Sequence, residues 1–240
     1  EAGVSVRHIV QQCGDRWREG FAGSWLPLPD RVSVAQAEMV AVGLAPLPSR
    51  DAVLAQLGPG VDTARTAAIA AAAARAQGWA WPVQVAALAA ALDSPQDVSA
   101  EVLAAAGAAL WDGLKSRRDA ILAHLVPGLV DLDVLDAGEL AVCRDYLGAA
   151  WLPGRPSMAD LGRVVQVAAV MPSSMCVGPL LLAGVVAAAV GNGVLAVGAC
   201  ERVLAVDPEH TLAGLVLADL EGGYRLRDLA RGRGDGDDGV

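Results

Sequence analysis

Residues 180–210 read LLLAGVVAAAVGNGVLAVGACERVLAVDPEH, and this stretch decides how the chain folds. The Gly-Asn-Gly sequence at 191–193 and the Asp207-Pro208 step are typical of helix ends and tight turns. The apolar pieces around them are therefore expected to form three consecutive helices joined by short turns. The predicted helices cover 180–190, 196–206 and 209–220.

The middle of this stretch resembles a known repeat. Residues 200–210, CERVLAVDPEH, are similar to the second helix of a tetratricopeptide repeat and its proline-marked exit. Small residues such as Ala196 and Gly184 would allow the two helices of the pair to approach closely. Because only one such unit is visible and a stable stack needs about three, we expect a tetratricopeptide-like helical pair and not a solenoid.

Helix signals of the same kind continue upstream. Alanine-rich segments, Ser or Asp caps, and stops at glycine or proline alternate at short intervals, so neighbouring helices are expected to pack antiparallel. A capping box, in which residues at the start of a helix bond each other's backbone, is predicted for Ser33 with Gln36, Asp136 with Glu139 and Ser157 with Asp160. A pattern of the same kind starts at Ser94 and runs to Leu125, and it predicts either one long helix or two that meet near Gly113. The other predicted helices cover 34–42, 50–57 after Ser49, 63–77, 82–92 beginning at Pro82, 137–151 and 158–170.

The first thirty residues follow a different pattern. Val6, His8 and Val10 alternate with polar residues before the Gly14-Asp15 step, which predicts a β-hairpin between Val4 and Phe21. An isolated hairpin is marginal in water, so we expect it to belong to a larger sheet, either upstream in the parent protein or formed with a partner. The predicted fold is mainly α, with a hairpin and linker over 1–31, an all-helical domain over 32–230 and a disordered tail over 231–240.

Composition narrows the class of protein. With 54% hydrophobic residues but only six Trp, two Tyr and one Phe, the core must be filled mainly by Ala, Val and Leu. The net charge of −9 opposes nucleic-acid binding, which depends on cationic contacts with phosphate. A nucleic-acid accessory role would have to use Arg16, Arg18 and Arg31 or the cations near Lys115, and we expect no such partner.

A membrane span is the main rival to this interpretation. No charged residue lies between Arg163 and Glu201, but prolines and glycines leave only Leu180 to Val190 uninterrupted, which is too short to cross a bilayer. We therefore expect no membrane association. The four cysteines are widely spaced, as is typical of buried thiols in a reducing cytoplasm. No signal peptide is visible, and the sequence leaves open whether the chain is a whole protein or the latter part of a longer one.

No catalytic, cofactor-binding or metal-binding residue is predicted. His8, His124 and His210 lack a second ligand at metal spacing, and His124 near its helix end is more simply a partner of the helix dipole. The carboxylates Asp131, Asp133 and Asp136 could bind Mg²⁺ or Ca²⁺, but a loop with Asp136 as an N-cap is the favoured interpretation.

Two charged groups invite a structural explanation. Arg144 and Asp145 interrupt an apolar helix beside Cys143, and we expect them to form an ion pair or an inter-helix clamp. The cluster of Lys115, Arg117 and Arg118 could meet an acidic partner, although a solvated helix face explains it equally well.

Several segments resemble an uncharacterised actinobacterial family, the domain-of-unknown-function family 4192. They are GLAPLPSRD at 43–51, VCRD at 142–145, LLLA at 180–183, GNG at 191–193, AVDP at 205–208 and LA at 212–213. The resemblance runs from about Gly3 to Leu226 and implies an α/β part followed by a helical part, of which this chain would hold the helical part and the last hairpin. Val190, before GNG, and Gly222-Gly223-Tyr224 depart from the family pattern. The family brings no established activity or cofactor.

Two functions remain open. A non-enzymatic cytoplasmic module that binds a protein partner or its own N-terminal domain fits the helical array best. The alternative is an accessory part of an enzyme whose active site lies in an N-terminal α/β region outside this chain. A homo-oligomer is compatible with either function.

Overall fold

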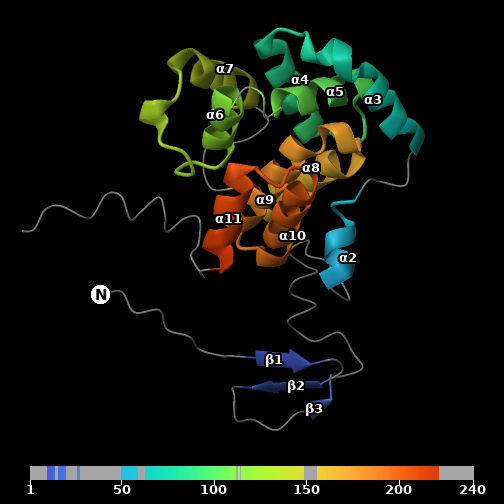
Figure 1. Cartoon of the computed structure of the whole chain (residues 1–240), viewed down its shortest axis with the longest axis vertical. Coiled ribbons are helices and arrows are strands. Elements are labelled where there is room, and N and C mark those ends of the chain that lie inside the picture. Colours follow the sequence, from blue (N-terminus) through green and yellow to red (C-terminus); the bar gives the residue numbers. More distant parts are fainter. Residues whose placement is uncertain are drawn as a thin grey trace, which may run out of the picture. The chain divides into compact units, whose positions relative to one another are not determined.

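The computed structural model describes residues 10–13, 16–19, 26–27, 50–58, 63–111, 113, 115–148 and 156–221. The chain divides into two units, Glu1–Pro46 and Leu47–Val240 (Figure 1). The helix predicted over 34–42, the Gly14-Asp15 turn and the tail over 231–240 lie outside the described residues.

The first unit contains a small antiparallel sheet with strand order β1-β2-β3. Strand β1 (Val10–Cys13) pairs with β2 (Arg16–Glu19), and β2 pairs on its other side with β3 (Leu26–Pro27). The third strand was not expected, because the prolines at 27 and 29 were predicted to end the extended segment. Pro27 is tolerated here because β3 is an edge strand.

Every element described in the second unit is a helix, so the prediction of a mainly α fold is confirmed. Between residues 50 and 221, its described parts contain ten α-helices and two short 3-10 helices. The elements are α2 Arg50–Ala55, α3 Thr63–Gln77, α4 Trp81–Asp93, α5 Ala100–Ala109, α6 Lys115–Leu125, η2 Leu132–Val134, α7 Ala137–Leu147, α8 Met158–Val170, η3 Ser173–Met175, α9 Val177–Val190, α10 Gly193–Val206 and α11 Thr211–Glu221.

Local capping chemistry fixes several helix starts where the sequence predicted them. The Ser157 backbone N–H donates to the Asp160 carboxylate at 2.8 Å, and the Asp160 N–H donates to Ser157 Oγ at 3.3 Å, so the capping box of α8 is confirmed. The Glu139 N–H donates to Asp136 Oδ1 at 3.0 Å, which confirms Asp136 as the N-cap of α7. The bounds of α3 and α8 are also as predicted.

The prediction that a helix starts at Ser94 is wrong. Ser94 ends α4, because its N–H donates to the Ala90 carbonyl, and α5 begins only after Ser99, whose Oγ accepts from the Val102 N–H at 3.3 Å. A side chain from another helix stabilises the turn between α4 and α5: Arg65 on α3 donates to the carbonyls of Pro95 and Val98 at 2.8 and 3.0 Å. The pattern up to Leu125 is therefore two helices, α5 and α6.

Three further helix ends differ from the predictions by three residues or more. Helix α9 begins at Val177, before Pro179, because a proline in the first turn removes no helical hydrogen bond. Helix α10 begins at Gly193, because Asn192 caps it through the Leu195 N–H at 3.2 Å. Helix α7 ends at Leu147, where Gly148 is the C-cap, and not at Trp151.

Small side chains allow the helices to pack closely. Helices α3, α4 and α5 pack together, and α8, α9, α10 and α11 pack in sequence beside them (Figure 1). A Cβ atom added to Gly184 on α9 would lie 3.1 Å from Cys200 Sγ and 3.3 Å from Ala199 Cβ on α10. The predicted close approach of these two helices at Gly184 is therefore confirmed. In the described part of the chain, no helix is both long and apolar enough to cross a membrane.

The close packing leads to a prediction about two helical glycines. An added methyl group at Gly178 would overlap the carbonyl oxygen of Leu110, whereas one at Gly162 meets nothing within 4 Å. Gly178→Ala should therefore lower the free energy of unfolding by about 1–3 kcal/mol, because a backbone atom cannot move aside. Gly162→Ala should raise it by about 0.5–1 kcal/mol, because alanine favours the helix. Urea unfolding followed by circular dichroism measures both, and equal effects would contradict this packing.

Candidate functional site

The cationic cluster at the start of α6 is divided between the surface and the interior. Lys115 is exposed, Arg117 is half-buried and the Arg118 side chain is only 6% exposed. The interpretation of the whole cluster as a solvated helix face is therefore wrong. Only Lys115 lies on a solvated face. Residues of a helix point in different directions, and the side chains of Arg117 and Arg118 turn toward other helices.

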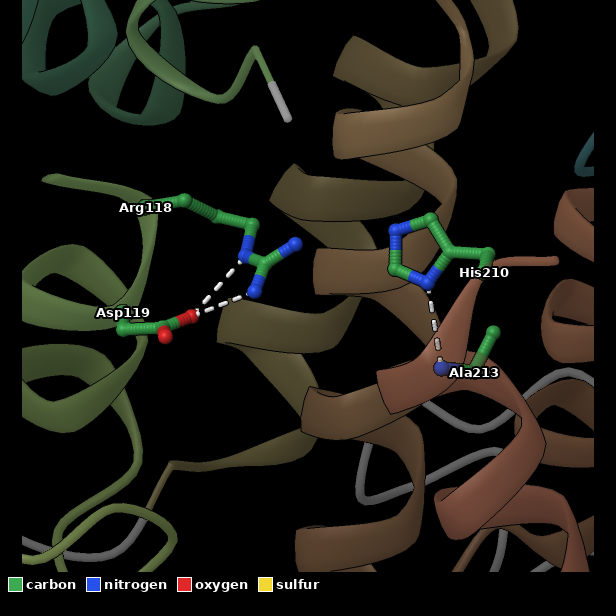
Figure 2. Close-up of polar contacts among 4 residues, drawn as sticks. All are labelled: Arg118, Asp119, His210 and Ala213. Carbon is green, nitrogen blue, oxygen red and sulfur yellow. Dashed lines mark hydrogen bonds and ion pairs between the residues drawn. The ribbon is translucent and has the colours of Figure 1, made fainter. Parts of the chain in front are cut away.

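Arg118 lies in a polar group with Asp119 and His210, in which Arg118 and His210 are buried and Asp119 is partly exposed (Figure 2). Its Nε and Nη2 atoms donate to Asp119 Oδ1 at 2.9 and 2.7 Å. The His210 imidazole faces the guanidinium from the turn before α11, and its Nδ1 accepts a hydrogen bond from the Ala213 N–H at 3.2 Å. His210, predicted to lie in a turn, is thus a buried helix cap.

Arg117 joins three helices. Its guanidinium carbon lies 5.3 Å from the ring centroid of Trp81 on α4, and its Nε lies 3.4 Å from Glu139 Oε1 on α7. Ser116 Oγ donates to the same carboxylate oxygen at 3.3 Å. We call Trp81, Ser116, Arg117 and Glu139 the three-helix clamp, because they hold α4, α6 and α7 together.

Sequence reasoning missed this clamp. Glu139 was assigned to a capping box with Asp136, but its carboxylate reaches across to α6 and only its backbone N–H contributes to the cap. Trp81 Nε1 and Glu139 Oε2 are buried and have no hydrogen-bond partner among the described residues. Each can accommodate one more polar contact, which ordered water often provides.

Arg144 and Asp145 do not form the predicted clamp. Both side chains are exposed on α7, and neither forms an ion pair with another residue in the described parts of the chain. The helix uses Glu139 instead, on the face that packs against α6. Spacing alone could not distinguish these two faces.

His124 lies in the last turn of α6, the helix end where the sequence placed it, but its surroundings disfavour the charged imidazole. Burial is the main cause that lowers the pKa of its imidazole, and the positive charge of Arg144 lowers it further. A histidine that is neutral at pH 7 provides no cation for the carbonyl end of α6. Its Nε2 atom is buried, with no hydrogen-bond partner in the ranges that the structure describes.

The three cysteines whose side chains the structure describes are poor nucleophiles. Burial raises the pKa of the Cys143 thiol to about 12 and that of Cys200 to about 11, with the nearby Glu139 and Glu201 carboxylates adding to the effect. Burial also raises the pKa of Cys176, a half-buried thiol. Since the thiolate is the reactive form, these three side chains are suited to packing and not to covalent chemistry.

The aspartates of the loop before α7 have local structural roles. Asp131 accepts a hydrogen bond from the Asp133 N–H at 3.0 Å, and Asp136 caps α7. Among the residues the structure describes, no three His, Cys, Asp or Glu side chains are grouped so as to hold a metal ion.

The exposed apolar side chains are the remaining feature that could have a function. Trp79 and Val83 lie at the start of α4, and Trp111 follows α5. Because α4 and α5 pack together and are joined by only residues 94–99, they are antiparallel, and these three side chains lie at the same end of the pair. We call Trp79, Val83 and Trp111 the tryptophan end.

These features define the class of protein as a helical array. In the part of the chain that the structure describes, polar side chains cap and join helices, and large apolar side chains lie on the surface. The family described as "Domain of unknown function (DUF4192)" matches residues 1–225, and the chain belongs to this family. The resemblance found in the sequence is thus confirmed. No curated protein and no solved structure matches the chain.

The division of the cationic cluster can be tested by two substitutions. Arg118→Ala should lower the free energy of unfolding by about 2–4 kcal/mol, because it leaves the Asp119 carboxylate partly buried without its partner. Lys115→Ala removes a cation from the same helix at an exposed position and should change stability by less than about 0.5 kcal/mol. Urea unfolding compares them, and a similar small loss for both would restore the solvated-face interpretation.

Proposed function

We propose that the protein is a non-enzymatic helical module of the cytoplasm that binds a partner protein through the tryptophan end. The observation that carries this proposal is the exposure of Trp111, Val83 and Trp79, at 53%, 49% and 36%. Tryptophan side chains dominate the binding energy of many interfaces, and large exposed apolar groups are typical of interaction sites. The raised cysteine pKa values and the capping roles of the aspartates favour binding over catalysis.

The surroundings of the tryptophan end favour an acidic partner. Lys115, at the start of α6, is exposed. Arg75, in the last turn of α3 and four residues before Trp79, is also exposed, and its guanidinium lies 3.9 Å from the Glu101 carboxylate on α5. Arg117 brings the start of α6 next to Trp81, two residues after Trp79. The partner surface that fits is an apolar segment flanked by carboxylates, so that charge aligns the complex while the aromatic rings supply the buried area.

We also infer that α9 and α10 form the tetratricopeptide-like pair. The support is their equal length of 14 residues, the tight turn at Gly191, where φ is 86°, and the close contact of Gly184 with Ala199 and Cys200. Helical pairs of this kind are interaction scaffolds, which agrees with a binding role. The free, buried thiols of Cys143 and Cys200 support the cytoplasmic assignment.

Affinity capture with matched surface variants tests the proposed function. The protein with Trp79→Ser and Trp111→Ser should lose its partner, whereas Val194→Ser with Leu215→Ser, two exposed apolar changes on α10 and α11, should retain it. The captured protein should carry an acidic segment, and purified complexes should weaken as salt rises.

Three outcomes would overturn the proposal. They are retention of the partner by the tryptophan variant, equal loss in both variants, and recovery of only a second copy of this chain. Unfolding curves of each variant serve as the control, because loss of partner is informative only for a protein that remains folded.

A further inference from the structure

We propose that His210 is a pH-sensitive cap that keeps α11 on the helical array only while its imidazole is neutral. Protonation would release the start of α11 and uncover the apolar surface of α9 and α10 beneath it. This inference does not rest on the tryptophan end and concerns the carboxy-terminal part of the described helices.

The cap geometry requires a neutral ring. His210 Nδ1 accepts from the Ala213 N–H at 3.2 Å, so its lone pair is in use and the ring proton lies on Nε2 (Figure 2). A protonated imidazole carries N–H groups on both nitrogens. Protonation would therefore set one donor against another and leave the buried Ala213 N–H without an acceptor, which is costly away from water.

The charges around the ring also oppose protonation. Arg118 from α6 faces the imidazole and, like it, is almost fully buried, at 5% and 4% exposure. Lys115 acts from the same helix, and Asp207 in the turn before His210 opposes both cations. Asp119 is already engaged by Arg118.

The charged residues of the other helices near α11 add little to the charges that act on the His210 imidazole. Helix α9 carries no charged residue between Val177 and Val190, and on α10 Glu201 pairs with Arg50 on α2 and is followed by Arg202. Burial is the first cause that lowers the pKa of His210, followed by Arg118.

The lowered pKa of His210 determines how stability changes with pH. A histidine whose pKa is lower in the folded state contributes stability that is present above its unfolded value of about 6.5. That contribution is lost as pH falls through the folded pKa, because the unfolded form takes up a proton that the folded form resists. His124, whose pKa is also lowered, acts in the same direction but lies on α6.

Helix α11 is the element that depends on this cap. It has 11 residues and contacts α10 and α9, against which Ala213 and Val216 are buried. No acidic residue lies in the first turn of α11. The His210 side chain is therefore the titratable hydrogen-bond acceptor at the start of this helix. Loss of the cap should therefore fray α11 from its first turn and expose the apolar positions it covers.

Hydrogen–deuterium exchange of the full chain at pH 7 and pH 5, corrected for the intrinsic pH dependence of exchange, tests the proposal. In the unaltered protein, protection of the α11 amides relative to those of α5 should fall at least about tenfold at pH 5. His210→Asn keeps a side-chain acceptor at the cap but removes the titration, so its α11 protection should be equal at both pH values.

A second variant leaves the His210 side chain in place, so it tests the proposal even if His210→Asn fails to fold. Lys115→Glu changes an exposed side chain and removes a cation that disfavours protonation of the folded ring. The pKa of His210 should then differ less between the folded and the released form, so the loss of α11 protection at pH 5 should be smaller. The proposal is overturned if α11 protection is the same at pH 7 and pH 5 in the unaltered protein, if His210→Asn shows the same loss, or if Lys115→Glu leaves the loss at pH 5 unchanged.

Discussion

The close approach of helix backbones through alanine and glycine is the constraint on which the rest of the structure depends. The chain has few large side chains with which to fill space, so apolar area can be buried only if the helices almost touch. Gly178 against the Leu110 carbonyl and Gly184 against Ala199 are two examples. Interiors of this kind have native density without bulky residues, and they tolerate added atoms poorly.

This tight packing determines where polar groups can lie. Arg118, His210 and Gln84 are buried, and each has at least one polar atom that meets a backbone or charged partner: Asp119, the Ala213 N–H and the Ala76 carbonyl. The three-helix clamp lies where α6 and α7 join α4. These side chains fix the relative positions of helices whose small-residue faces would otherwise specify few directions.

Local features of the fold could be predicted from the sequence, and long-range ones could not. The Ser157–Asp160 box and the Asp136 cap depend on residues three apart, so spacing reveals them. The meeting of Arg118 with His210 and of Arg117 with Trp81 and Glu139 depends on how distant helices pack. No periodicity in one helix shows which partner a charged face will meet, and so Arg144 and Asp145 were assigned the role that Glu139 performs. Arg65, which holds the turn after α4, was missed for the same reason.

The proposed binding role and the pH-sensitive cap both require that the helices are arranged as described. The most direct test is a nuclear Overhauser measurement on the protein in solution, between the Gly184 α-protons on α9 and the Ala199 methyl group on α10. With an added Gly184 Cβ only 3.3 Å from Ala199 Cβ, the account predicts a strong cross-peak. A missing cross-peak, with Gly184 instead contacting large side chains from another element, would contradict the close-packed arrangement.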